Sequence, residues 1–144
     1  MRVNYESVVN WRLATDLLRI NPLFHGQPRY DCAIVKVKED EYIFARLLHT
    51  FECIIRDKTY YMALTLPMDL PPDHRFRVRN KDLHFIHIRA RPRSSSTFIS
   101  VESIVQGALM VKDFHSEYED EYIVFDVVDS DMWQRLKTLP LSRR

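Results

Sequence analysis

The stretch that decides the fold runs from Phe98 to Val111, FISVESIVQGALMV, and an acidic spacer separates it from Glu121 to Trp133, EYIVFDVVDSDMW. The first stretch predicts a strand, a tight turn at residues 101–104 and a second strand, because apolar and β-branched residues flank a short polar interruption. The second stretch predicts a third strand that leads into a short helix. Such a run is typical of small curved β-barrels that bind other macromolecules.

The remaining segments extend this pattern toward the N-terminus. Apolar residues recur at helical spacing at the start of the chain, at Val8, Trp11, Ala14 and Leu18, so a helix is expected there. Further strands are expected at residues 31–38 (DCAIVKVK), 42–56, 60–66 and 83–90. The segment at 42–56 is long and apolar enough for a helix, but the turn residues at both of its ends favour a strand. Two prolines predict a loop at residues 21–30.

Together these elements predict a single α+β, mainly β domain over residues 1–144. It comprises an N-terminal helix at 1–21, a small curved β-barrel at 30–128, and a C-terminal helix and tail at 129–144. Ser130 is a candidate N-cap for the last helix, and Pro140 would end it. We expect both end helices to pack on the barrel through four apolar side chains, Trp11, Leu18, Trp133 and Leu136.

Composition places the chain among ordinary globular proteins. Its 144 residues are 46% hydrophobic and 28% charged, with a net charge of +1, which is enough to build one core. No apolar run approaches the ~20 residues of a membrane span, and the N-terminus lacks the layout of a signal peptide, so no membrane partner is expected. Cys32 and Cys53 lie within apolar runs and read as free thiols, which favours an intracellular, reducing compartment.

Basic residues concentrate in one region and acidic residues in another. Seven bases form the candidate nucleic-acid interface: Arg75, Arg77, Arg79, Lys81, Arg89, Arg91 and Arg93. On an extended segment the alternating arginines would project from one side and could neutralise phosphates. The same pattern also fits a charged sheet edge that discourages strand pairing. Because residues 113–134 are acidic and the net charge is small, the bipolar chain also suits a protein partner, self-association or an intramolecular clamp.

No catalytic signature is present. Gly26 and Gly107 are the only glycines, so neither a phosphate-cradling loop nor a dinucleotide fingerprint can be built. His84 and His87 are three residues apart and face opposite sides of a strand, which does not suit metal binding. The sequence therefore predicts no catalytic residue, no metal and no cofactor.

Two alternatives remain open at this stage. Clustered carboxylates at Asp126, Asp129 and Asp131 would suit a divergent metal nuclease, although the last two more simply serve the start of a helix. Numerous aromatic residues could instead form a cage for methylated ammonium groups. The candidates for such a cage are Tyr30, Tyr42, Tyr60, Tyr61, Tyr118, Tyr122, Trp11 and Trp133.

Two resemblances add a biological setting. VESIVQGALMV, an acidic spacer and EYIVFDVVD resemble the second half of bromo-adjacent homology (BAH) domains, which are β-rich modules of chromatin proteins. From Tyr5 to about Lys137, the chain is also similar to a module of proteins associated with Kyakuja, Dileera and Zisupton-type DNA transposons of mushroom-forming fungi. The residues that carry this similarity are NWRLATDLLRINPLFHGQPRYDCAIV, FARLLHTFECIIRD, RARPRSSSTFISVESIVQGALMV and EYIVFDVVDSDMWQRLK. The resemblances imply a nuclear setting.

The sequence thus predicts a non-catalytic macromolecule-binding module of a nuclear, transposon- or chromatin-related protein, which binds nucleic acid or a protein or peptide. A structural or oligomerisation domain without a ligand is the alternative, and a divergent metal-dependent nuclease is the third.

Overall fold

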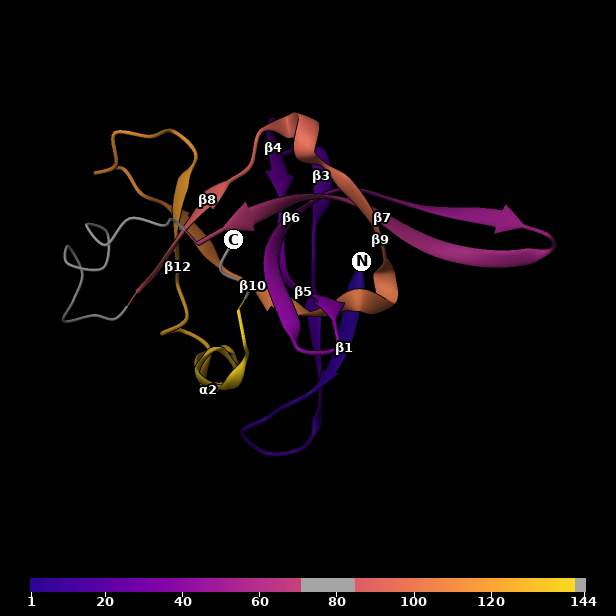
Figure 1. The fold of residues 1–144 in the computed structure, drawn as a ribbon, viewed down its shortest axis with the longest axis horizontal. Helices are drawn as coiled ribbons and strands as arrows, with labels where there is room; N and C mark the ends of the chain where they lie inside the picture. The colour runs from indigo at the N-terminus through magenta and orange to yellow at the C-terminus, as the bar shows by residue number, and fades with distance from the viewer. Residues whose placement is uncertain (71–84, 142–144) are drawn as a thin grey trace.

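An eight-stranded antiparallel sheet carries the fold (Figure 1). The structure, a computed structural model, describes residues 1–70 and 85–141. Seven strands follow one another across the sheet, and β9 (Thr97–Ser100) pairs with β7 off this path. In spatial order the seven are β10 (Ile104–Ala108), β5 (Cys32–Lys38), β6 (Glu41–Ile55), β7 (Lys58–Asp69), β8 (Ile86–Ala90), β12 (Glu121–Val124) and β11 (Met110–Lys112).

The centre of the sheet is buried on both faces. Ile34 and Phe44 belong to one apolar cluster, whereas Ala33, Val35 and Ala45 belong to a second cluster. Because successive residues of a strand point to opposite faces, a continuous apolar run such as CAIV suits a strand covered on both sides. The predicted strands at 31–38, 42–56 and 60–66 are therefore confirmed as β5, β6 and β7, and β7 continues through Pro67, which pairs with Ala45.

The stretch from Phe98 to Val111 folds as its sequence predicts. β9 runs into a single 3-10 turn, η2 (Val101–Ser103), and β10 follows at once. The Ser100 hydroxyl accepts a hydrogen bond from the Glu102 amide at 3.3 Å, which caps the turn. A second short turn, η1 (Arg93–Ser95), precedes β9.

The prediction of a closed barrel is wrong. The two edge strands, β10 and β11, are separated in the chain by Leu109 alone, so the sheet curls until its edges are near each other. The two strands do not pair, and the Gly107 amide on β10 donates to the Asp16 carboxylate at 2.8 Å. β11, with three residues, pairs with β12. The result is a curved sheet with two edges.

The predicted N-terminal helix at residues 1–21 is also wrong. The segment forms a hairpin of β1 (Arg2–Glu6) and β2 (Leu13–Leu17), followed by the start of β3 (Ile20–Phe24). Val3 and Leu18 enter the core, whereas Trp11 lies at the turn with a positive φ of 57° and is 75% exposed. The helical spacing of four apolar residues was therefore accidental, and burial of Val3 and Leu18 decided the structure.

Residues 21–30, predicted as a loop, form a second hairpin. β3 pairs with β4 (Gln27–Tyr30) around His25 and Gly26, which both have positive φ. Proline is tolerated in both strands because this two-stranded ribbon has free edges. Gly26 suits the left-handed backbone that a two-residue hairpin turn requires.

The C-terminal helix is confirmed as α2 (Ser130–Thr138), and it is the one α-helix in the described part of the chain. Its N-cap is Asp129 rather than Ser130, and the Asp129 side chain accepts a hydrogen bond from the Asp131 amide. Met132 and Leu136 face the core. Trp133 is 42% exposed and lies under Lys137, whose Nζ is 3.2 Å from the ring centroid, so the expectation that Trp133 anchors the helix is wrong.

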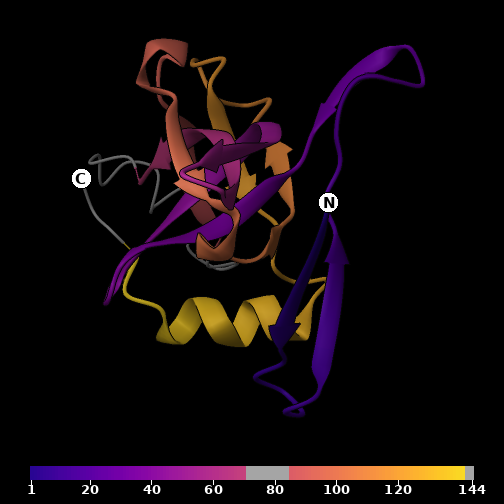
Figure 2. The same cartoon turned by 90° about the vertical axis from the view of Figure 1, so that its right-hand side faces the viewer.

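The β1–β2 hairpin lies beside α2 (Figure 2), and polar contacts join the two. The Val8 amide donates to the Asp131 carboxylate at 2.8 Å, and the Arg135 guanidinium donates to the Glu6 carbonyl at 2.7 Å and to Asp131 at 3.1 Å. Burial would raise the pKa of Asp131, but hydrogen bonds from Ser7, Arg135 and Val8 outweigh it and hold the pKa below its ordinary value. The carboxylate is therefore ionised and structural.

Candidate functional site

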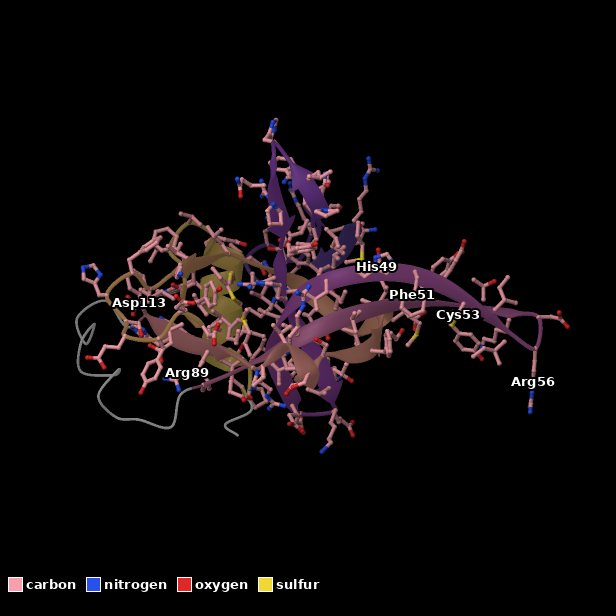
Figure 3. The ribbon with its side chains drawn as sticks, turned by 90° about the horizontal axis from the view of Figure 1, so that it is seen from above. His49, Phe51, Cys53, Arg56, Arg89 and Asp113 are labelled. Carbon is pink, nitrogen blue, oxygen red and sulfur yellow. The ribbon has the colours of Figure 1, made fainter. Side chains whose placement is uncertain are left out.

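The outer halves of β6 and β7 project from the body as a two-stranded arm, residues 48–61 (Figures 1 and 3). β5 pairs with β6 only as far as Arg46, and β9 pairs with β7 only from Met62 to Thr65. Among the described residues, no strand pairs with β6 beyond this point on its β5 side. The arm therefore presents a free strand edge about eight residues long.

One face of the arm is apolar and largely aromatic. His49, Phe51 and Cys53 alternate along β6 and so share this face, and Figure 3 follows them along the arm. The Phe51 ring lies 6.2 Å from His49 and 5.6 Å from Phe98 on β9. Cross-strand pairing adds the side chains of β7 that lie opposite. We call this set the arm face: His49, Phe51, Cys53, Ile55, Tyr60, Met62, Leu64 and Phe98.

Exposure separates the arm face from the core. Phe98 is 61% exposed and Ile55 is 56% exposed, whereas Phe44 on the same strand as Ile55 is 2% exposed. The arm face includes no carboxylate, and Lys58 lies beside it with its ammonium 5.3 Å from the Tyr60 ring centroid. Large exposed apolar groups gathered on one face indicate an interaction surface, whereas scattered ones would not.

A strained turn ends the arm. Arg56 and Asp57 both have positive φ, 48° and 62°, which is the conformation of a type I′ turn without the usual Asn-Gly sequence. This conformation costs non-glycine residues about 1–2 kcal/mol each. The turn places Arg56 at the far end of the molecule (Figure 3).

Two of the predicted nucleic-acid-binding residues are held by carboxylates. Arg89 donates through Nε to the buried Glu121 at 3.0 Å and through Nη2 to the same oxygen, and its guanidinium lies 4.0 Å from the Tyr118 ring centroid. Arg91 makes a two-point contact with Asp69 at 2.7 and 2.6 Å. Hydrogen bonds to these carboxylates raise the pKa of both arginines.

The other five candidates fall into two groups. Arg93 is exposed at the start of η1. The remaining four, Arg75, Arg77, Arg79 and Lys81, lie outside the described residues. Contact of the candidate nucleic-acid interface with phosphates therefore stays a prediction, and two of its residues, Arg89 and Arg91, are already paired with carboxylates.

Buried titratable groups near β8 have structural neighbours. His87 Nδ1 lies 3.5 Å from Asp113, and both side chains are 5% exposed. Glu121 accepts from Arg89 and also from the Ser116 hydroxyl. These contacts hold the loop between β11 and β12 against β8. Within residues 1–70 and 85–141, no group of three or more His, Cys, Asp or Glu side chains is placed to hold a metal ion.

Several aromatic rings proposed for a cage already face cations of this chain. Lysines or arginines lie over Tyr60, Tyr118, Tyr122 and Trp133. Among the described residues, no stacked pair joins two of the eight cage candidates. Both cysteines are free, and burial raises the pKa of the Cys32 thiol, which suits a packing role.

Sequence reasoning missed the arm face, although one signal was available. The segment at 42–56 is about twice as long as the strand it pairs with at 31–38. An antiparallel strand that outruns its neighbour must leave part of its edge and faces uncovered, so the difference in length marks His49 to Ile55 as projecting.

Comparison with known proteins adds no relative. The sequence matches no model of a known protein family, and neither a curated protein nor a solved structure matches it. Within the described residues, no helix has the length and apolar character needed to cross a membrane.

Proposed function

We propose that this chain is a non-catalytic binding module that docks a protein partner on the arm. The observation that carries the proposal is the arm face, which gathers exposed apolar side chains from β6, β7 and β9 on a projecting ribbon. Burial of this surface against a partner contributes about 25 cal/mol for each Å² of apolar area removed from water.

The free edge of β6 supports an extended partner segment. Backbone groups along residues 48–55 have no strand beside them on the β5 side in the described structure, so an added strand can form a ladder there. The side chains of such a strand alternate between the two faces, and those on the arm-face side would contact Phe51 and Cys53.

A protein is favoured over nucleic acid by the placement of charge. The arm carries Arg56 and Lys58 near its tip, balanced by Glu52 and Asp57, so it has no dense basic stripe. Arg89 and Arg91 are engaged with carboxylates. The resemblances described above extend the proposal to a nuclear protein linked to chromatin or transposons.

The test uses the purified chain as bait in a nuclear extract, with two variants at exposed apolar positions. Phe98→Asn removes a 61% exposed ring from the arm face, whereas Leu23→Asn removes a 76% exposed side chain from the β3–β4 hairpin. We expect partners that are retained by the wild type and by Leu23→Asn but lost with Phe98→Asn.

Two outcomes would contradict the proposal. Retention that survives Phe98→Asn and Ile55→Asn would exclude the arm face. Salt-dependent binding of duplex DNA that is lost on Arg93→Ala and unaffected by Phe98→Asn would favour the nucleic-acid alternative instead.

A further inference from the structure

A second feature, which shares no residue with the arm, is a cavity of about 310 Å³ where the N-terminal hairpins meet β10 and α2. We call it the junction cavity. Its apolar wall includes Leu17, Leu109, Met110, Phe125 and Met132. Its charged lining residues are Asp16, Arg29, Asp31, Arg46 and Asp129. A cavity that combines apolar walls with charged groups can hold a small ligand that has an apolar body and a charged end.

Two of the three carboxylates are already supplied with hydrogen-bond donors. Asp31 accepts from Arg29 Nε at 3.0 Å and from the Arg19 amide at 2.7 Å. Asp16 accepts from the Gly107 amide at 2.8 Å. Since each of these contacts belongs to the fold itself, neither carboxylate needs a ligand cation to satisfy it.

The third carboxylate is satisfied in the same way. Asp129 accepts from the Asp131 amide at 2.9 Å and from the Gln106 side-chain amide at 3.1 Å. The acceptors around the cavity are thus matched by donors of the chain. None of the three carboxylates therefore lacks a hydrogen-bond donor.

Arg46 differs from the carboxylates because it has donor capacity to spare. No carboxylate of the described residues lies within 4 Å of its guanidinium. Its guanidinium carbon lies 4.6 Å from the Tyr122 ring centroid, and Tyr122 and Cys32 are the polar neighbours that act on its charge. Burial lowers the pKa of Arg46, but its interactions with Tyr122 and Cys32 outweigh burial and raise the pKa, so Arg46 stays charged. A guanidinium has five N–H donors, so two partners leave donors that can bond to water or to a ligand.

We propose that the junction cavity binds an apolar monocarboxylate, with the carboxylate on Arg46 and the apolar part against Leu109, Phe125 and Met132. A planar carboxylate fits the fork of a guanidinium through two parallel hydrogen bonds. The apolar wall supplies contact area for the rest of the ligand.

The charges around the cavity narrow the ligand class. Asp16, Asp31 and Asp129 repel a doubly charged phosphate more strongly than a single carboxylate, although each of the three is hydrogen-bonded. A simple cation is disfavoured because Arg46 and Arg29 border the same space. The ligand is therefore a monoanion with an apolar body, either a free small molecule or the C-terminal end of a peptide.

The test titrates the ¹⁵N-labelled chain with N-acetyl-leucine and records backbone amide shifts. N-acetyl-leucinamide, which has the same apolar body without the charge, is the matched control ligand, and inorganic phosphate is the second. We expect saturable shifts at the amides of Cys32, Gly107 and Leu109 with a Kd on the order of 1 mM, and at least tenfold weaker binding of the amide and of phosphate.

Variants of the lining residues distinguish a loss of ligand binding from a loss of folding. Arg46→Gln should weaken binding of N-acetyl-leucine by at least tenfold. Leu109 is 51% exposed at the cavity, so Leu109→Glu adds a repelling charge without disturbing the core, and Leu109→Gln is its neutral control. We expect loss of binding with Leu109→Glu and retention with Leu109→Gln.

The proposal is overturned if the acid and the amide cause equal shifts, if phosphate binds more tightly, or if Leu109→Glu binds as well as Leu109→Gln. A peptide with a leucine C-terminus that binds at least tenfold more tightly than N-acetyl-leucine would support the proposal and identify a chain end as the source of the carboxylate. The Phe98→Asn variant should leave these titrations unchanged, so failure here leaves the proposed arm function standing.

Discussion

Two of the antiparallel ribbons of this protein, the β1–β2 hairpin and the arm, differ in how they are held to the body. The β1–β2 hairpin is fastened to α2 and β10 by Asp131, Arg135 and Asp16, whose side chains bond to backbone groups across the contact. For residues 52–61 of the arm, no side-chain hydrogen bond to the body occurs within the described part of the chain. Side-chain hydrogen bonds thus hold the β1–β2 hairpin on the body, whereas the outer part of the arm lacks them and is available to a partner.

The difference also changes what a substitution should cost. A lone two-stranded ribbon is marginally stable in water, so the hairpin depends on its ties to the body. The rings of the arm face are half-buried or exposed and contribute little to folding. Substitutions in the β1–β2 hairpin should therefore change the free energy of unfolding, and substitutions in the arm should change partner binding.

The largest effect on stability is expected from removal of the Asp131 carboxylate, which joins the hairpin to α2. Asp131→Ala should lower the free energy of unfolding by about 3–5 kcal/mol, because it leaves Arg135, with a side chain 13% exposed, without its carboxylate. Urea denaturation measures the loss. Glu119→Ala, which removes an exposed carboxylate, should stay within about 0.5 kcal/mol, and equal losses in the two variants would show that Asp131 is no tie.

A steric change at the same contact should have the next largest effect. A Cβ at Gly107 would lie 2.8 Å from Leu18 Cδ2 and 2.9 Å from Asp16 Oδ2, closer than atoms approach. Gly107→Val should therefore cost about 1–3 kcal/mol and increase hydrogen exchange at the Leu18 amide. Thr59→Val on the exposed arm should change neither quantity, and protection of Leu18 that survives Gly107→Val would contradict the close approach.

Acidification should change the contributions of Asp131 and Asp16 to stability in opposite directions. The pKa of Asp131 lies below its ordinary value of 3.8, so its contribution is present above pH about 4 and is lost as pH falls through the lower folded value. Burial chiefly, with repulsion from Asp129 and Asp131, raises the pKa of Asp16, so the ionised form costs stability as pH rises above about 4.

Two amide variants measure this difference. Below pH about 4, Asp131→Asn should lose stability relative to the wild type as the pH rises, because the wild-type carboxylate becomes ionised in this range. Above pH about 4, Asp16→Asn should gain stability relative to the wild type as the pH rises. Urea denaturation at several pH values measures both. The same sign in the two variants would refute the electrostatic account of the contact.

The smallest effect on stability is expected on the arm. Phe98→Asn should change the free energy of unfolding by less than about 1 kcal/mol, because the ring is 61% exposed and loses chiefly its contact with Phe51. Thermal unfolding of the purified variant measures this. A loss comparable to that of Asp131→Ala would mean that the arm face supports the fold rather than a partner.

Sequence patterns predicted the strands of the large sheet because the signals are local. The turn at residues 101–104 and the alternation or continuous apolar runs in β5, β6 and β7 identify strands without any knowledge of their neighbours. The candidate site was harder. The pairing of Arg89 with Glu121 joins residues 32 apart in the chain, so a basic pattern in the sequence could not reveal that one of its charges was already bound.

The sequence by itself determined a mainly β chain with a C-terminal helix, since turn residues and apolar periodicity act over a few residues. Only the tertiary structure decided that residues 1–21 form strands and that the arm face lies open. In both cases the deciding quantity is burial. Val3 and Leu18 are buried in a core that the helical spacing within residues 1–21 did not reveal. Ile55 stays exposed because the pairing of β5 with β6 ends at Arg46 and the pairing of β9 with β7 ends at Met62.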